Sequence, residues 1–200
     1  MSTKGDETRH AILSKAFELA TVAGLEGVSI GRLAEELDLS KSGLFAHFGS
    51  KEALQVAVIE EASRVFIQDT LLPALRAARG EPRVRALFNR WLEWGTRPGG
   101  CFFVAASAEL DDRPGPARDA LIKAQHQWLD EIAIAVGIAK DEGHFRDDLD
   151  PQQFAFEAYS VMLGAHLFNR FLRDPQASAR TRRAFDGLIA DARAPHRKRN

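Results

Sequence analysis

Apolar residues recur at intervals of three and four along almost the whole chain, which is the period of a helix that buries one face. The first segment with this pattern runs from residue 7 to residue 24, where a glycine is placed to end it. Its apolar positions are Ile12, Leu13, Ala16, Phe17, Ala20 and Ala23. We find no convincing run that alternates between apolar and polar residues, as a half-buried strand does. The pattern predicts an all-α protein.

Two short helices are expected next, each introduced by a serine. Ser29 is a suitable N-cap for residues 30–37, because its hydroxyl can accept a hydrogen bond from a backbone N–H of the first turn. A three-residue break follows, and Ser40 can cap a second short helix over residues 41–48 in the same way. Two short helices joined by a tight turn are therefore expected between residues 29 and 48.

Longer helices are expected over the rest of the chain. One starts at Lys51, and Pro73 should kink or end it, because proline removes a helical hydrogen bond. Asp150 and Asp174 each precede a proline, a pair that caps and opens a helix, so both should start helices. The predicted later helices cover residues 83–97, 101–110, 116–142, 151–173 and 175–192. This order predicts a small N-terminal unit joined to a larger helical body.

The composition, with 45% hydrophobic and 28% charged residues, is that of a folded globular chain. A net charge of -1 means that any binding of nucleic acid must come from a local patch. Cys101 is the single cysteine, which excludes an internal disulfide and fits a reducing compartment. Neither a secretory signal nor an apolar run of membrane-spanning length is visible. We expect a soluble, cytoplasmic protein with no membrane segment.

The segment between Ser40 and Lys51 carries no acidic residue, although acidic residues outnumber basic ones around it. Its two short helices have the spacing of a DNA-binding helix-turn-helix. The packed side would consist of Leu33, Leu37, Leu39, Leu44 and Phe48, and the free side of Lys41, Ser42 and Ala46. Lys41 can reach a base or a phosphate. The same shape also occurs in proteins that bind no DNA, so the spacing alone leaves both readings open.

The segment VSIGRLAEELDLSKSGLFAHFGSKEAL resembles the N-terminal signature of the TetR family of bacterial transcriptional repressors. The resemblance implies a three-helix helix-turn-helix DNA-binding domain over residues 1–54 and a ligand-binding and dimerisation domain over residues 55–192. Residues 193–200 would be a disordered basic tail. The resemblance assigns phosphate contacts to Ser29, His47 and Lys51. It assigns base-facing roles to Lys41, Ser42 and Gly43, and Ser40 and Phe45 complete the candidate DNA-binding set.

Two positions depart from the family pattern. Phe45 stands where the family usually has tyrosine, so a hydroxyl that could bond a phosphate is missing, although the ring can still pack on the sugar-phosphate backbone. Asp38 stands where the family favours glycine in the turn. Aspartate tolerates the left-handed conformation better than most residues do, so the turn should form.

The resemblance also implies a small-molecule pocket within the C-terminal bundle. Its candidate lining residues are Phe88, Trp91, Trp94, Phe102, Phe103, Glu109, His126, Trp128, Tyr159 and His166. The aromatic members suggest an apolar or aromatic effector, with Glu109, His126, Tyr159 or His166 as polar anchors. Aromatic residues at helical spacing are also typical of an ordinary core, and histidines of this kind are often surface residues, so the set remains open.

The helix that begins at Pro151 carries two opposed apolar faces, whereas a surface helix needs only one. The second face requires a covering surface, either another helix of the chain or a partner subunit. The resemblance implies a homodimer formed by the last two helices. The candidate interface residues are Phe154, Val161, Ala165, Leu167, Phe168, Phe171, Phe185, Leu188 and Ile189, and the pattern leaves open which face serves.

The remaining chemistry-bearing residues point to no further site. Cys101 is expected to be small, buried and inert. The acidic loop around His144 and Asp150 matches no metal-binding spacing, so no metal and no cofactor are expected. No phosphate loop, nucleophile elbow or HExxH helix suggests an enzyme. We expect a ligand-responsive repressor that binds a double-stranded, pseudo-palindromic operator, with a helical binding or scaffolding protein as the alternative.

Overall fold

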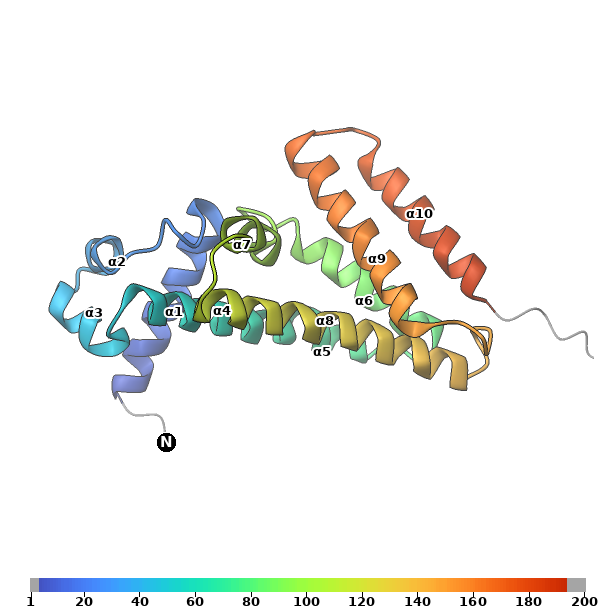
Figure 1. The fold of residues 1–200 in the computed structure, drawn as a ribbon, viewed down its shortest axis with the longest axis horizontal. Helices are drawn as coiled ribbons and strands as arrows, with labels where there is room; N and C mark the ends of the chain where they lie inside the picture. The colour runs from blue at the N-terminus through green and yellow to red at the C-terminus, as the bar shows by residue number, and fades with distance from the viewer. Residues whose placement is uncertain (1–3, 194–200) are drawn as a thin grey trace, which may run out of the picture. The chain divides into compact units, whose positions relative to one another are not determined.

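The computed structural model describes residues 4–193 and consists of helices joined by turns, with no strand in that range. The predicted all-α class is confirmed. The helices that carry an α label are α1 Lys4–Ala23, α2 Ile30–Leu37, α3 Lys41–Phe48, α4 Lys51–Phe66, α5 Leu72–Leu75, α6 Glu81–Trp94, α7 Phe102–Leu110, α8 Pro116–Asp141, α9 Pro151–His166 and α10 Ala177–Ala192. Two π-helical segments, η1 Ile67–Leu71 and η2 Leu167–Phe171, follow α4 and α9 (Figure 1).

The chain forms two compact units that divide the sequence differently from the predicted boundary at residue 54. Unit 1 contains the chain up to Phe66 together with Arg97–Gln125, so α7 and the start of α8 belong with the helix-turn-helix. Unit 2 contains Ile67–Thr96 and the chain from His126 onward. The predicted tail from residue 194 onward lies outside the described residues.

Local capping sets most of the helix ends. Gly24 follows α1 with φ +81°, a conformation that glycine adopts without steric cost, so the predicted stop is confirmed. Asp150 caps α9 by accepting hydrogen bonds from the backbone N–H groups of Gln152 and Gln153. Asp174 does not cap α10. Its side chain accepts from Gln176 N at 2.8 Å in a local turn, and α10 begins only at Ala177, so the predicted helix start is wrong by two residues.

Pro73 does not end the helix that starts at Lys51. The chain passes from α4 through the π-helical turn η1 into α5, with Pro73 in the first turn of α5. Proline has no N–H to donate and its ring displaces the carbonyl one turn earlier, so a widened turn directly before it accommodates both effects.

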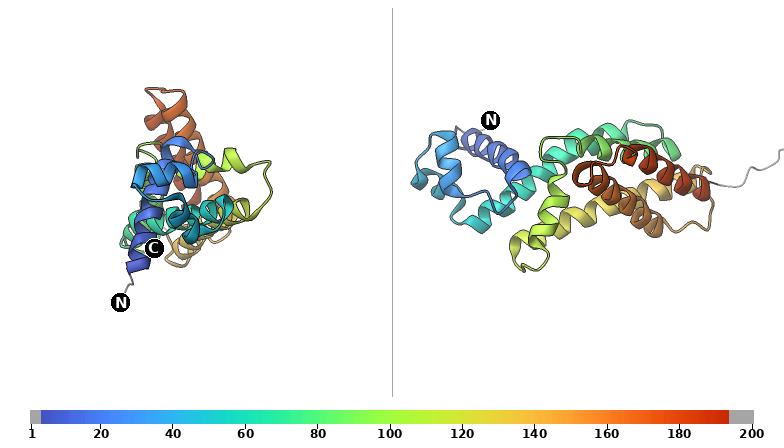
Figure 2. Two further views of the ribbon diagram at one scale, coloured as in Figure 1. Left: turned by 90° about the vertical axis from the view of Figure 1, so that its left-hand side faces the viewer. Right: turned by 90° about the horizontal axis from the view of Figure 1, so that it is seen from above.

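Unit 2 is held together by aromatic packing between α6 and the last two long helices. The rings of Phe88 and Phe185 stack with centroids 3.7 Å apart and planes 4° from parallel. Trp91 meets Tyr159 edge to face at 6.2 Å. α9 and α10 run side by side in Figure 1 and in the right-hand view of Figure 2. This packing fixes the positions of α6, α9 and α10 relative to one another.

An ion-pair cluster joins the first turn of α6 to the end of α10. The carboxylate of Glu81 accepts from Arg193 Nη2 at 2.8 Å and from Arg85 Nε at 2.8 Å. Arg193 has the largest effect among the groups that lower the pKa of Glu81, from its ordinary 4.5 to about 2. Arg193, the first residue of the predicted tail, is therefore fixed by this contact.

Replacing Glu81 with glutamine should lower the melting temperature at pH 7 and have little effect near pH 2. The folded state lowers the pKa of Glu81, so the stabilisation is complete above pH 4.5 and is lost as the pH falls toward 2. Thermal unfolding of Glu81→Gln and of the wild type from pH 2 to pH 7 measures the difference in melting temperature at each pH. A difference in melting temperature that stayed constant with pH would contradict the role of the Glu81 charge.

Candidate DNA-binding surface and effector cavity

The two short helices of unit 1 are fixed by serine caps at both N-termini. Ser29 Oγ accepts from Arg32 N at 3.2 Å, and Ser40 Oγ accepts from Gly43 N at 3.0 Å. Ser40 Oγ also lies 3.2 Å from Ser42 Oγ. Both predicted caps are confirmed. The hydroxyl groups of Ser29 and Ser40, two candidate DNA-binding residues, are therefore already hydrogen-bonded within the protein.

The turn between α2 and α3 depends on Asp38. Its backbone has φ 52° and ψ 43°, the left-handed conformation that favours glycine and that aspartate tolerates. Leu39 N donates to Ala34 O at 2.9 Å and closes the end of α2. The predicted turn therefore forms with aspartate in the place of glycine.

One side of α3 packs into unit 1 and the other is open to solvent. Leu44 has no exposed surface and Phe48 is 8% exposed. Phe45 is 55% exposed, so its ring is available for contact with another molecule. The other exposed candidate residues here are Lys41, Ser42, Gly43 and His47. The structure thus brings most of the predicted DNA-binding side chains to one accessible helix.

Lys41 lies beside the start of α2. A Cβ atom built on Gly31 would lie 3.8 Å from Lys41 Nζ and 3.9 Å from Ser29 Oγ. The ammonium group of Lys41 and the hydroxyl group of Ser29 are therefore both close to Gly31, in the first turn of α2. Another cation, which was not predicted from the sequence, lies at the other end of α3. The guanidinium of Arg9 is 5.4 Å from the centre of the Phe48 ring. Positive groups therefore flank both ends of α3.

Lys51 is held by a carboxylate of its own unit. Its Nζ donates to Glu26 Oε2 at 2.8 Å, and Gln55 Nε2 donates to the other oxygen at 2.9 Å. These two contacts are the main causes of a lowered pKa at Glu26, so the carboxylate stays ionised. Lys51 is half exposed, and a phosphate at this position would compete with Glu26.

Glu109, a predicted pocket residue, ties α7 to the loop that leads into α2. Its two carboxylate oxygens accept from Leu25 N at 3.0 Å and from Glu26 N at 2.8 Å. A Cβ on Gly24 would lie 2.5 Å from Glu109 Oε1, so this approach needs glycine at residue 24. α7 is thereby joined directly to the segment that holds Ser29 and Glu26.

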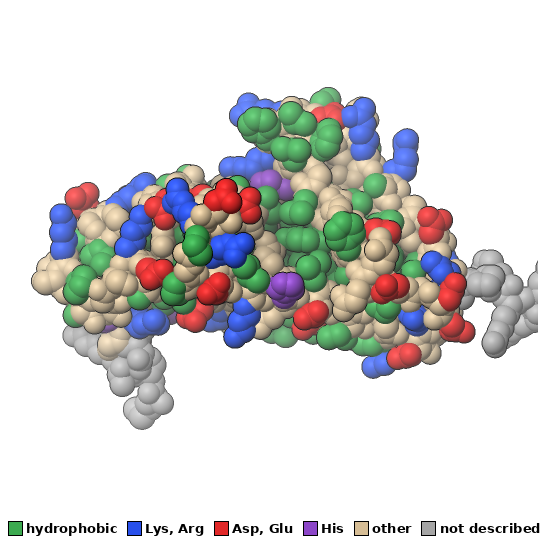
Figure 3. Space-filling view, viewed as in Figure 1, with side chains coloured by type: hydrophobic (Ala, Val, Ile, Leu, Met, Phe, Trp, Pro, Cys, Tyr) green, Lys and Arg blue, Asp and Glu red, His purple; other side chains and the backbone are tan. Residues whose placement is uncertain are grey.

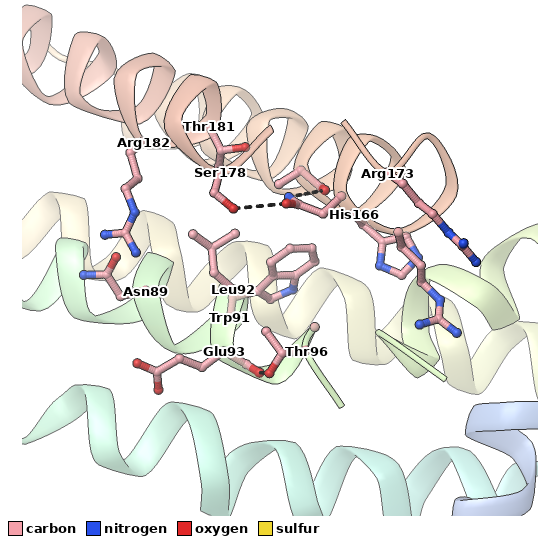
Figure 4. Close-up of a pocket in the computed structure, with 14 residues that line it drawn as sticks. Asn89, Trp91, Leu92, Glu93, Thr96, His166, Arg173, Ser178, Thr181 and Arg182 are labelled. Atoms are coloured by element: carbon pink, nitrogen blue, oxygen red, sulfur yellow. Dashed lines mark hydrogen bonds between the residues drawn. The ribbon is translucent and has the colours of Figure 1, made fainter. Parts of the chain in front are cut away.

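A cavity of about 730 Å³ opens in unit 2 between α6, the end of α9 with η2, and the start of α10 (Figure 4). Its volume lies within the usual range for small-molecule sites, about 300–1,000 Å³. The lining residues are Asn89, Trp91, Leu92, Glu93, Gly95, Thr96, Ala165, His166, Asn169, Arg170, Arg173, Ser178, Thr181 and Arg182. Burial and the nearby Arg170 lower the pKa of His166, so its imidazole is neutral at pH 7.

Only two of the ten predicted pocket residues, Trp91 and His166, line this cavity. His126 is exposed, and Glu109 has the backbone partners described above. The predicted aromatic residues that are buried in the cores of their units are Phe88, Trp94, Phe102, Phe103 and Trp128. Tyr159 packs on Trp91. The arginines of the cavity were not predicted from the sequence, because a helical arginine is usually a solvated surface residue.

The structure distinguishes the two apolar faces of α9. Phe154 and Ala165 are 2% and 3% exposed, and Phe185 and Ile189 of α10 are 4% and 0% exposed. These four side chains pack inside unit 2 and have no surface to offer a partner, which corrects their place in the predicted interface. Val161 and Leu188 are half-buried.

An exposed apolar face remains along α9 and η2. It consists of Phe156, Leu163, Leu167, Phe168, Phe171 and Leu172, whose exposed fractions run from 39% to 78%. Phe156, Leu163 and Leu172 were not in the predicted interface. Figure 3 shows apolar side chains gathered at the tip where η2 leads toward α10. An apolar patch of this kind is typical of a protein interface.

The structure also bears on Cys101, on metal-binding clusters and on membrane-spanning helices. Cys101 is fully buried next to the start of α7, in agreement with the expected packing role. Within residues 4–193, no group of three or more histidine, cysteine or acidic side chains is arranged to hold a metal ion. None of the described helices is both long and apolar enough to cross a membrane.

Comparison with known proteins covers both units. Residues 12–58 match the family described as bacterial regulatory proteins, tetR family, and residues 80–185 match the tetracyclin repressor-like C-terminal domain. The HTH-type transcriptional repressor NemR of Escherichia coli (strain K12) is 27% identical over 167 residues, which are 80% of this chain and 83% of NemR.

Two solved structures share the fold over nearly their whole length. A TetR-family regulator from Cytophaga hutchinsonii has a TM-score of 0.85 and 22% identity, covering 98% of this chain and 99% of its own. AibR, solved with isovaleryl coenzyme A and operator DNA, has a TM-score of 0.68 and 23% identity, covering 94% and 99%. Because the matched C-terminal family alone spans more than half of the sequence, the chain belongs to the TetR family of bacterial transcriptional regulators.

Proposed function

We propose that this protein is a ligand-responsive transcriptional repressor that binds a pseudo-palindromic operator as a homodimer and releases it when a small molecule occupies unit 2. Its place of action is the cytoplasm, where a bacterial operator lies. Its task is regulated binding rather than the conversion of a substrate. The observation that carries the proposal is α3, a capped helix with an open face in a unit whose sequence matches the DNA-binding domain of the family.

The face of α3 suits a helix in the major groove. Ser42 and Gly43 are small enough to let the backbone approach base edges, and Phe45 can lie against the sugar-phosphate backbone. Lys41 has two possible positions, because its ammonium lies next to Ser29 at the start of α2 but its side chain is long enough to turn toward a base. Helix N-termini attract phosphate, so the position beside Ser29 favours a backbone contact.

Regulation requires a connection between the two units. α8 contributes residues to both units, and Glu109 of α7 holds the loop before α2 through two backbone N–H groups. A ligand that favours another arrangement of unit 2 would change the spacing of the two recognition helices in the dimer. A coupling free energy of about 1–3 kcal/mol between ligand and DNA is enough to shift such an equilibrium.

Lys51→Ala should weaken binding to all DNA sequences and lower the dependence on salt. Each phosphate contact contributes about 0.9 to the slope of log K against log salt, and a dimer has two copies, so the slope should fall by about two. Fluorescence anisotropy of a labelled operator between about 50 and about 300 mM salt, a roughly sixfold range of concentration, measures this slope.

Two matched variants test the assignment of Lys51. Glu26→Gln should strengthen binding, because it removes the carboxylate that competes with phosphate for Lys51. Lys123→Ala, an exposed lysine on α8, removes the same charge and should leave the slope unchanged. An equal loss of slope in Lys51→Ala and Lys123→Ala would show that net charge, and not a contact by Lys51, sets the affinity.

The exposed apolar face of α9 and η2 supports the homodimer. This face runs along α9, which packs on α10. In a dimer with a two-fold axis, α9 and α10 of both protomers would form a four-helix interface. The two copies of α3 could then read two half-sites one helical turn of DNA apart.

A further inference from the structure

Three arginines line the cavity of unit 2, and no described residue neutralises any of them. Arg170, Arg173 and Arg182 form no ion pair and no side-chain hydrogen bond with any residue in the range 4–193. Glu93 is the acidic member of the lining, and its carboxylate accepts from Arg90 Nη1 at 2.9 Å. With His166 neutral, three arginines and one glutamate give the lining a formal charge of +2.

The uncharged polar groups of the cavity are largely engaged within the protein. Asn169 Nδ2 donates to Ala165 O at 2.8 Å, and Ser178 Oγ donates to Asn169 Oδ1 at 3.1 Å. Thr96 Oγ1 donates to Glu93 O at 2.7 Å. The guanidinium groups are therefore the main hydrogen-bond donors left for a ligand.

The charged groups lie at the ends of the cavity and the apolar ones lie between them. Figure 4 shows His166 and Arg173 at one end, Asn89 and Arg182 toward the other, and Trp91 and Leu92 in the middle. Arg170 belongs to the first end, because its charge acts on His166. This arrangement suits an elongated molecule with a charged end and an apolar body.

The backbone at the first end is unusual in two ways. Arg173 has φ 51°, in the left-handed region that a long side chain rarely adopts, and the preceding segment η2 is π-helical. Left-handed conformations of non-glycine residues are strained and occur most often where function requires them. π-helical turns show the same tendency. Both features place arginine side chains at the rim of the cavity.

We propose that the cavity binds a small organic anion, with a carboxylate or phosphate held by Arg170 and Arg173 and an apolar or aromatic body against Trp91 and Leu92. Arginine suits such groups because its planar fork can donate two parallel hydrogen bonds to them. Arg182 and Asn89 would receive a polar group at the far end. Only the identification of this anion as the effector rests on the proposed function.

Two fluorescent probes of nearly equal shape test the requirement for charge. 8-Anilinonaphthalene-1-sulfonate is an anion, and N-phenyl-1-naphthylamine is its uncharged counterpart. Titration of the full chain should give an affinity at least about tenfold higher for the sulfonate, because charge-assisted hydrogen bonds are formed only with the anion. Equal affinities, or binding of neither probe, would overturn the proposal.

A double variant locates the binding. Arg170→Gln with Arg173→Asn should weaken sulfonate binding about tenfold or more and leave the neutral probe unaffected. Asparagine tolerates the left-handed conformation of residue 173, so the variant should keep its melting temperature. The charge-matched control is Arg76→Gln with Arg183→Gln, two exposed arginines of unit 2 outside the cavity lining.

The outcomes separate this site from other surfaces and from the function in gene regulation. An equal loss of affinity for the sulfonate in both double variants would mean that net charge attracts the probe. Unchanged affinity in the cavity variant would mean that the probe binds elsewhere, for example on the apolar face of α9. Either result overturns the proposal. No DNA is present in these titrations, so failure of operator binding would not affect them, and failure here would leave the repressor function standing.

Discussion

Replacing Leu167 and Phe171 with glutamate should convert the protein to monomers and abolish tight operator binding. The two side chains are 48% and 78% exposed on the apolar face of η2, so the substitutions should not disturb the core of unit 2. A dimer interface would place four additional carboxylates in an apolar environment, each at a cost of several kcal/mol. Light scattering during size-exclusion chromatography measures the mass.

Operator binding by the same variant should fall about 10²–10⁴-fold, because the dimer links two half-site contacts and a monomer loses that advantage. The matched control is Ile122→Glu with Ile134→Glu, which puts the same charges on exposed apolar positions of α8. The control should remain dimeric. A dimer that survived in the Leu167 and Phe171 variant would place the interface on another surface.

Adding one methyl group at Gly99 should destabilise the protein by about 2–4 kcal/mol. Gly99 has φ +84°, and a Cβ built there lies 1.9 Å from the carbonyl oxygen of Thr21 in α1. The new atom would meet backbone, which cannot rotate away as a side chain does. Gly99→Ala should therefore lower the melting temperature by about 5–15 °C in a thermal scan.

Gly143→Ala separates the two causes of this loss. Gly143 has a similar φ of +71°, but its Cβ would meet nothing within 4 Å. This variant should show the backbone strain alone, about 1 kcal/mol. Equal losses in the two variants would mean that Gly99 is needed for its conformation and not for the close approach of its loop to α1.

Features that depend on near neighbours could be predicted from the sequence. Ser29, Ser40 and Asp150 each cap a helix through residues two or three positions away, so the local pattern contains the whole interaction. The helix start predicted at Asp174 was wrong because an Asp-Pro pair can form a turn as well as a helix cap. Which of these two structures forms depends on how the chain packs after η2.

Features that depend on distant residues could not be predicted. Glu109 accepts hydrogen bonds from residues 84 and 83 positions away, and nothing in its own neighbourhood indicates that role. Periodicity could not choose between the two apolar faces of α9, because both repeat at helical spacing and only burial separates them. η2 adds a second difficulty. Its wider turn shifts the register, so Phe168 is 43% exposed although a regular helix would place it with the buried Phe154.

The proposed repressor function requires that α3 reads DNA in a symmetric dimer. Selection of bound fragments from a randomised DNA library by the full-length protein, followed by sequencing, tests it directly. We predict an enriched inverted repeat whose half-sites are centred about one helical turn apart, with Lys41→Ala changing the preference at a symmetric pair of positions if Lys41 reads a base. Recovery of no enriched sequence, even at low salt, would contradict sequence-specific DNA binding by α3.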